Sequence, residues 1–510
     1  MLRSFDRCRT APGGHGESQL CAKRARNHAP VEFCDATANL SGMMADPVGN
    51  GDEQAVANFA AQYSKGLPHD AFGEVDASAY RALQRACTSN LEADWAAVPM
   101  GGTARQVSPQ DAWAFQMEGA DPTRLRIAAA PTFASEQRAA EMCEVYWMAL
   151  LRDVPFERYD DSELAAAAVA DLRRFALFHD VTPQTLFRGV TSGEKVGPYL
   201  SQFLWKPVPY GMTTITQKYA AGLHGVDFMT SLAECLRVQN GVAPSQSLAL
   251  GAPGYARCGR DLGEYVHKDF TYQAFLNAAL ILLALGGAAL DDANPYKAYA
   301  NRAGFVCMGG PDVLSMVAQV AALALKAAWY QKWSVNRTLR PEAFALRVHQ
   351  NESAARSYPI HAKLIASPVL DRVHAAHGSL LLPQAFPEGS PTHPSYPAGH
   401  AAIAGACVTV LKAFFKEGFV LPNPVVASDD GTALEAYSGT LTVGGELDKL
   451  ASNIATGRNI AGVHYWSDGI EGLRLGEQVG LAFLADIRTT YPESFAGFAL
   501  SRFDGRTITI

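Results

Sequence analysis

The sequence lacks an apolar run long enough to cross a bilayer, which takes roughly 20 residues. The nearest candidate, residues 275–290, is shorter and contains Asn277 and a Gly-Gly pair, and a second apolar stretch at residues 321–328 is interrupted by Lys326. We therefore expect residues 275–290 to form a buried core helix of a soluble protein that has no membrane partner.

Cysteine pairs and basic clusters are scarce as well. The nine cysteines include no C-x-x-C pair and are odd in number, so a disulfide framework is not expected to define the fold, although one pair or an intersubunit bridge stays open. The net charge of −7, without a basic cluster beyond the N-terminal arm, argues against a nucleic-acid partner. The chain also has no glycine-rich nucleotide loop and no His/Cys zinc set.

Linkers are missing too. Helical stretches follow one another from about residue 130 without a Ser/Gly linker or a charge run. Although length alone favours two or three domains, this continuity predicts an all-α fold with one large helical domain at residues 46–510. Residues 1–45 scatter Arg and Lys among Gly, His and Ser without the apolar core of a signal peptide, which predicts a flexible or loosely attached arm and leaves the localisation unknown.

Three short segments near the C-terminus combine fixed cations with histidines. They are Lys332 with Arg340-Pro341, the heptapeptide PSYPAGH at residues 394–400, and Arg458 with His464. A multiply charged oxyanion needs several cationic donors at once, and Arg and Lys supply them. Because Lys332 and Arg340 are about two helical turns apart, at the end of an expected helix that starts near residue 313, both are expected to reach one cavity as that helix ends near Pro341.

Neighbouring residues suit the same pocket. Gly399 lets a backbone amide approach an anion at the start of an expected helix over residues 400–419. Asp468, four residues after His464, is a reasonable orienting partner for that histidine. Each residue alone has an ordinary structural reading, as a solvated surface cation or a hydrogen-bonded core histidine. Their occurrence together favours an active-site core at about residues 310–480.

The pattern Lys-x7-Arg-Pro, Pro-Ser-x-Pro-x-Gly-His and Arg-x5-His-x3-Asp resembles the signature of the vanadium-dependent haloperoxidases and the type 2 phosphatidic acid phosphatase superfamily. Phosphatases of the superfamily usually have six rather than seven residues between Lys and Arg. Longer stretches resemble the bromoperoxidases of marine algae and cyanobacteria, namely GRDLGEYVHKDFTYQAFLNAALILL from Gly259, NPYKAYANRAGFVCMGGPD from Asn294, KAAWYQKWSVNRTLRPE from Lys326 and PEGSPTHPSYPAGHA from Pro387. The resemblance implies a pair of four-helix bundles.

It also implies vanadate, that is vanadium(V), as the cofactor and gives each site residue a role. The residues that hydrogen-bond vanadate oxygens would be Lys332, Arg340, Gly399 and Arg458. His464 would be the vanadium ligand and His400 the acid–base group, so that His400, His464 and Lys332 form the catalytic set.

A second group of residues is expected to surround the halide or to contact the residues that bind vanadate. Its members are His393, which is typical of the bromoperoxidase branch, Trp329, Gln331, Ser395 and Asp468. Two positions depart from the family. Ala398 stands where a serine hydroxyl often contacts vanadate, which bears on affinity, and Gln331 stands where some coralline algal relatives have Arg, which bears on halide preference.

The function implied is oxidation of bromide by hydrogen peroxide to a hypohalous acid equivalent that halogenates small organic acceptors, with iodide also used and chloride poor. A homo-oligomer, a dimer or dodecamer, is implied as well. Two alternatives stay open. One is a soluble acid phosphatase that uses the same pocket through a phosphohistidine at His464. The other is a helical anion-binding scaffold without turnover.

Overall fold

The computed structural model describes residues 48–510 apart from residue 192. The arm expected at residues 1–45 lies outside the described residues. Within residues 47–510, which form one compact unit, helices dominate and the strands are short. The expected all-α fold with a single large domain is confirmed.

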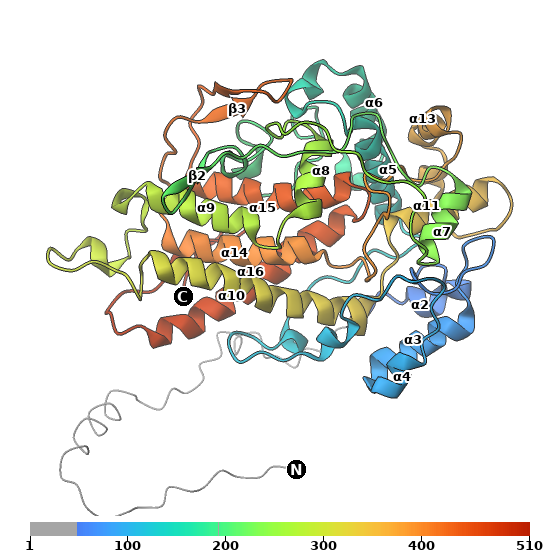
Figure 1. Ribbon diagram of the computed structural model, residues 1–510, viewed down its shortest axis with the longest axis horizontal. Helices are drawn as coiled ribbons and strands as arrows, with labels where there is room; N and C mark the ends of the chain where they lie inside the picture. Colours follow the sequence, from blue (N-terminus) through green and yellow to red (C-terminus); the bar gives the residue numbers. More distant parts are fainter. Residues whose placement is uncertain (1–47, 192) are drawn as a thin grey trace, which may run out of the picture. The chain divides into compact units, whose positions relative to one another are not determined.

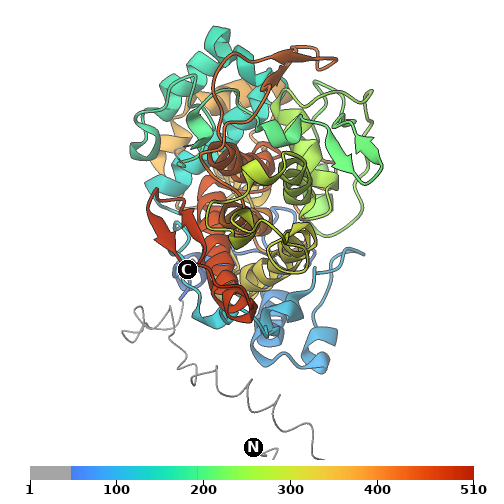
Figure 2. The ribbon, with the colours of Figure 1, turned by 90° about the vertical axis from the view of Figure 1, so that its left-hand side faces the viewer.

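Four long helices form the centre of the domain: α10 (Gly310–Trp329), α14 (Gly399–Phe414), α15 (Val443–Ile460) and α16 (Trp466–Thr490). Helix α14 packs against the other three, and Figures 1 and 2 show it within this bundle. Glycines permit the close α14–α16 contact, because a Cβ at Gly405 or Gly476 would collide with a backbone carbonyl of the facing helix.

A second group of helices gathers about α5, the buried helix Glu136–Leu151. Helix α5 also packs against α15, which joins the two groups. The helices that pack on α5 are α6 (Glu163–Leu172), α11 (Pro341–Glu352), α12 (Ala362–Ile365) and α13 (Pro368–His377).

The remaining elements cover these groups. The helices are α2 (Asp52–Ala55), α3 (Ala77–Ser89), α4 (Glu92–Ala96), α7 (Leu232–Gln239), α8 (Gly259–Lys268) and α9 (Gln273–Ala284). Three antiparallel pairs of strands are β1 (Val208–Tyr210) with β2 (Thr213–Ile215), β3 (Val425–Ala427) with β4 (Leu434–Ala436), and β5 (Ala499–Ser501) with β6 (Thr507–Thr509). The cysteines within the described residues are free thiols.

The apolar helices belong to the core. The expected helix at residues 275–290 is α9, which is largely buried and ends before the positive-φ Gly286. Helix Gly310–Asn336 is the one helix of the described residues long and apolar enough to span a membrane. Because it packs against α9, α14 and α16, we read it as a core helix of this bundle.

The helix that carries Lys332 ends earlier than expected. Helix α10 continues as a π-helical segment, Tyr330–Asn336, and stops where Arg337 adopts a left-handed φ of 39°. Arg340 therefore does not share a helix with Lys332. It is the N-cap residue of α11, whose first residue is Pro341. Two separate elements, rather than one helix running to Pro341, deliver these cations to the pocket.

Candidate active site

The three cation-bearing segments meet in one buried place. The Lys332 ammonium donates hydrogen bonds to the backbone carbonyls of Pro394 (2.8 Å) and Ser395 (2.7 Å), in the segment that leads into α14. Arg340 Nη1 donates to the carbonyl of Val463, just before α16, at 2.7 Å. Hydrogen bonds from the two cations thus connect segments that are more than 60 residues apart in the sequence.

Arg340 contacts two of the predicted histidines. Its Nη1 lies 2.9 Å from Nε2 of His464, and its Nη2 lies 3.0 Å from Nδ1 of His393. A guanidinium has only donors, so both ring nitrogens must accept. Burial, together with Arg340 and Lys332, holds the pKa of each histidine well below its usual value. Both rings are therefore neutral at neutral pH.

The hydrogen-bond partners of His464 define its tautomer. Its Nδ1 lies 2.7 Å from Oδ2 of Asp468. The same carboxylate oxygen accepts hydrogen bonds from the Ser395 hydroxyl and, at 3.3 Å, from the Tyr465 amide. Nδ1 therefore carries the hydrogen and Nε2 keeps its lone pair. His464 therefore presents an unprotonated ring nitrogen to Arg340, and its role as the vanadium ligand stays a prediction.

The pocket has excess positive charge. Lys332, Arg340 and Arg458 are 0%, 1% and 6% exposed. Asp468 is the carboxylate that acts on both Lys332 and Arg340. The carboxylates that act on Arg458 are Asp269, Glu388 and Glu264. Burial lowers the pKa of both arginines to about 10 and that of Lys332 well below its usual range. Burying like charges is costly unless a counterion joins them. This charge set therefore calls for an anion.

Hydrogen-bond donors of the cations remain available for that anion. Arg458 donates from Nη1 to the Val266 carbonyl at 2.8 Å, and its buried Nε has no partner within the described part of the chain. Lys332 uses two of its three donors, on Pro394 and Ser395. Because unpaired buried donors are rare, these groups fit a tetrahedral oxyanion of the phosphate or vanadate kind.

His400, the predicted acid–base residue, is partly exposed and lies beside Asp269. It is the second residue of α14, its side chain is 22% exposed, and its Nε2 lies 3.1 Å from Oδ1 of Asp269. The amides of the first helical turn have no intrahelical partner and can donate to an anion. Packing also favours glycine at position 399, since a Cβ there would lie 3.2 Å from the Trp329 ring.

The predicted halide or outer residues divide into two groups. The Trp329 ring tilts against the His393 ring at 4.8 Å, beside the cations. The Gln331 amide instead donates to the Leu125 carbonyl at 3.4 Å and accepts from Asn336 at 3.3 Å, with no contact to the cation cluster recorded among the described residues. Its predicted influence on the halide is therefore at most indirect.

Sequence reasoning missed two partners of the site. Asp269 is 131 residues from His400, so no local spacing links them, although it lies within one of the stretches that carry the family resemblance. Arg138 of α5 stacks its guanidinium over the Tyr465 ring at 3.7 Å and is one cause that lowers the pKa of Asp468, against a larger rise from burial. No motif points to it.

Comparisons with known proteins find relatives over most of the chain. A family model for the VCPO second helical-bundle domain matches residues 313–491. The vanadium-dependent bromoperoxidase of Corallina pilulifera is 36% identical over 89% of this chain and 91% of the relative. That of Ascophyllum nodosum is 35% identical over 89% of this chain and 88% of the relative.

A solved structure is similar over nearly the whole length. The second vanadate-dependent bromoperoxidase of Ascophyllum nodosum, a homohexamer, matches with a TM-score of 0.89 at 28% identity, covering 99% of this chain and 93% of its own.

Proposed function

Since this chain belongs to the family of vanadium-dependent bromoperoxidases, we propose that it uses hydrogen peroxide to oxidise bromide to a hypobromous acid equivalent, with vanadate as cofactor. The observation that carries the proposal is the buried set of Lys332, Arg340 and Arg458 around the lone pair of His464 Nε2. An anion-binding scaffold would need the cations but not a histidine held in a ligand tautomer by a carboxylate.

The residues present fit the cofactor. Lys332, Arg340, Arg458 and the amide of Gly399 would hold the vanadate oxygens, and His464 Nε2 would be the metal ligand. Vanadate, when bound, supplies a Lewis-acidic centre that activates hydrogen peroxide without a required change of oxidation state. The cations lower the cost of concentrating negative charge there, and Lys332 would polarise the reacting oxygen.

His400 would move the proton. Its Nε2 hydrogen is directed to Asp269 at 3.1 Å, which leaves Nδ1 as the basic nitrogen. A neutral imidazole so placed can accept a proton from hydrogen peroxide and later return it to a leaving oxygen. Asp269 would orient the ring and stabilise its protonated form, as a carboxylate partner does for other catalytic histidines.

His393 and Trp329 would shape the halide side of the pocket. Their rings pack together at 4.8 Å, and Arg340 fixes the His393 ring. We propose bromide as the working halide, iodide as a second substrate and chloride as a poor one, because chloride is the hardest of the three to oxidise. The oxidised halogen would then react with small organic acceptors.

Assembly as a homo-oligomer completes the proposal. The similar structure from Ascophyllum nodosum is a homohexamer, whereas the family resemblance implied a dimer or dodecamer for this chain. Light scattering of the purified protein at micromolar concentration distinguishes these states. A monomer would contradict the proposed assembly and leave the proposed activity untouched.

The test is reconstitution of metal-free protein. Removal of vanadate at low pH in phosphate should abolish bromination of a phenolic dye, and addition of orthovanadate alone should restore this activity. The same preparation should be assayed for hydrolysis of a chromogenic phosphate ester. If the metal-free protein hydrolyses the ester and never brominates with vanadate, the phosphatase alternative, with a phosphohistidine at His464, replaces this proposal.

A further inference from the structure

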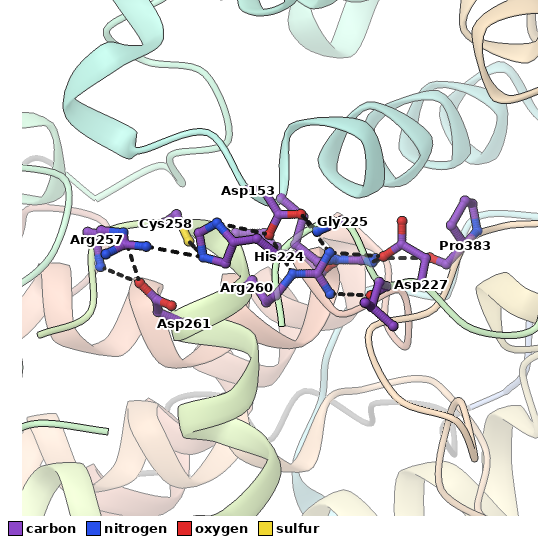
Figure 3. Close-up of polar contacts among 12 residues, drawn as sticks. Asp153, His224, Gly225, Asp227, Arg257, Cys258, Arg260, Asp261 and Pro383 are labelled. Carbon is purple, nitrogen blue, oxygen red and sulfur yellow. Dashed lines mark hydrogen bonds and ion pairs between the residues drawn. The ribbon is translucent and has the colours of Figure 1, made fainter. Parts of the chain in front are cut away.

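A second cluster of metal-ligating side chains lies where the end of α5 meets the start of α8 (Figure 3). Asp153 follows α5, His224 belongs to the loop after β2, and Cys258 is the N-cap residue of α8. One ligand atom from each residue lies within 4.8 Å of the other two, a spacing that no other set of His, Cys, Asp and Glu attains within the described part of the chain.

The donors have the chemistry and nearly the spacing of a tetrahedral metal site. Cys258 Sγ lies 3.9 Å from His224 Nε2, and His224 Nδ1 lies 3.9 Å from Asp153 Oδ1. Sulfur, nitrogen and oxygen ligands at about 2.0–2.3 Å from zinc are roughly 3.5 Å from one another. These two contacts use different ring nitrogens, so the exposed imidazole would have to turn to direct one nitrogen to both neighbours.

We propose that Asp153, His224 and Cys258 form a site for a divalent metal ion of the zinc type, separate from the vanadate pocket. A thiolate, an imidazole and a carboxylate suit such an ion, with water in the fourth position. As the sulfur–metal bond forms, the thiol proton passes to solvent, so no oxidant or reductant takes part.

Surrounding groups already fix the Asp153 carboxylate. Arg260 donates to both of its oxygens, with Nη2 2.7 Å from Oδ2, and the Gly225 amide donates to Oδ2 at 2.7 Å. A carboxylate offers about four lone-pair positions, and these contacts use three. Hydrogen-bonded ligands of this kind are the usual outer support of metal sites.

Arg257 is the competitor at this site. Its Nη2 lies 3.3 Å from Nε2 of His224, where it places a positive charge beside the ligand nitrogen. Its side chain is 23% exposed and also bonds the Asp430 carbonyl, so it can give up the histidine without becoming unpaired. Arg257 should therefore weaken the metal affinity rather than abolish it.

A metal here would stabilise the packing of the end of α5 against α15. Arg152, next to Asp153, donates to the Ile460 carbonyl at 3.0 Å and to the Pro383 carbonyl at 2.9 Å. Ile460 ends α15, the helix that carries Arg458. Because an ion that binds only the folded chain shifts the unfolding equilibrium, zinc should raise the unfolding temperature.

The full-length protein is first freed of bound metals by a chelator and then titrated with Co²⁺. We expect one equivalent to give a thiolate-to-cobalt absorption band that Zn²⁺ abolishes. His224→Ala should remove the band, and Cys258→Ser should do the same. The matched control is His179→Ala, since His179 is also exposed and contacts the Ala176 carbonyl. Vanadate-dependent bromination by the His224→Ala protein should stay unchanged.

Two outcomes would overturn the proposal. One is the absence of a stoichiometric cobalt–thiolate band in the unmodified protein. The other is a band that survives His224→Ala, a substitution at a side chain 40% exposed that the fold should tolerate. Arg257→Ala gives an independent check, because removal of the competing cation should tighten Co²⁺ binding severalfold. Unchanged or weaker binding in that variant would contradict the assigned geometry.

Discussion

Replacement of Asp468 by Asn separates the metal–nitrogen bond from simple anion binding. Asp468 Oδ2 accepts the Nδ1 hydrogen of His464 at 2.7 Å and also hydrogen bonds from Ser395 and Tyr465. Loss of such a carboxylate partner typically costs 10–100-fold in metal affinity, about 1.4–2.8 kcal/mol. Asp468→Asn should weaken vanadate by this factor.

The same substitution should have the opposite effect on an anion that forms no bond to His464. Asp468 is a carboxylate that offsets the buried charges of Lys332 and Arg340. Its removal increases the excess positive charge, so phosphate, measured as a competitor of vanadate, should bind as tightly as before or more tightly.

The assay titrates metal-free protein with orthovanadate and, separately, with phosphate. The unfolding temperature is the signal that reports binding in each titration. Ser395→Ala is the control, since it removes a hydrogen bond to the same oxygen without a change of charge. Its effect on vanadate should be smaller and its effect on phosphate negligible. If vanadate and phosphate weaken in parallel in Asp468→Asn, then Asp468 acts on the fold and not on the ligand nitrogen.

Three further predictions concern the other pocket residues. His400→Ala should keep vanadate bound but slow turnover by about 10²-fold or more, whereas His464→Ala should lose vanadate; equal loss in titrations of both would refute the roles. Ala398→Ser should tighten vanadate binding about tenfold, because a well-placed hydroxyl contributes roughly 1.4 kcal/mol. The Ser395 hydroxyl does not already supply this donor, since it donates to Asp468. An unchanged vanadate affinity in the variant would refute this prediction. Burial and the nearby cations hold the pKa of His464 and His393 below the unfolded value near 6.5, so below about pH 6.5 the unfolded chain binds more protons than the folded one. These two groups should therefore lower the free energy of unfolding as the pH falls below about 6.5, which chemical denaturation measures. A free energy of unfolding that these groups raise at low pH would contradict this.

The sequence was most informative where spacing alone brings groups together. His464 and Asp468 are four residues apart, and their side chains meet at 2.7 Å as expected. The co-occurrence of cations with histidines indicated an anion pocket, and Arg340 indeed contacts both His393 and His464. The His464–Asp468 pair depends on local spacing, and the anion pocket was indicated by the chemistry of an oxyanion, whereas the contacts of Arg340 with the two histidines depend on tertiary packing.

What could not be predicted depends on backbone details and distant contacts. The left-handed conformation of Arg337 ends the π-helical segment, and no residue type there forces it. Asp269 reaches His400 only through the packing of segments 131 residues apart. The direction of the Gln331 side chain follows from its partners Leu125 and Asn336, which sequence spacing does not connect to the pocket.

A crystal structure of the vanadate-loaded protein tests the central claim most directly. The account predicts vanadium within bonding distance of His464 Nε2, with its oxygens contacted by Lys332, Arg340 and Arg458, and with the Arg340 Nη1 contact to Nε2 replaced. Vanadate bound elsewhere, or held in this pocket without a bond to His464, would contradict it.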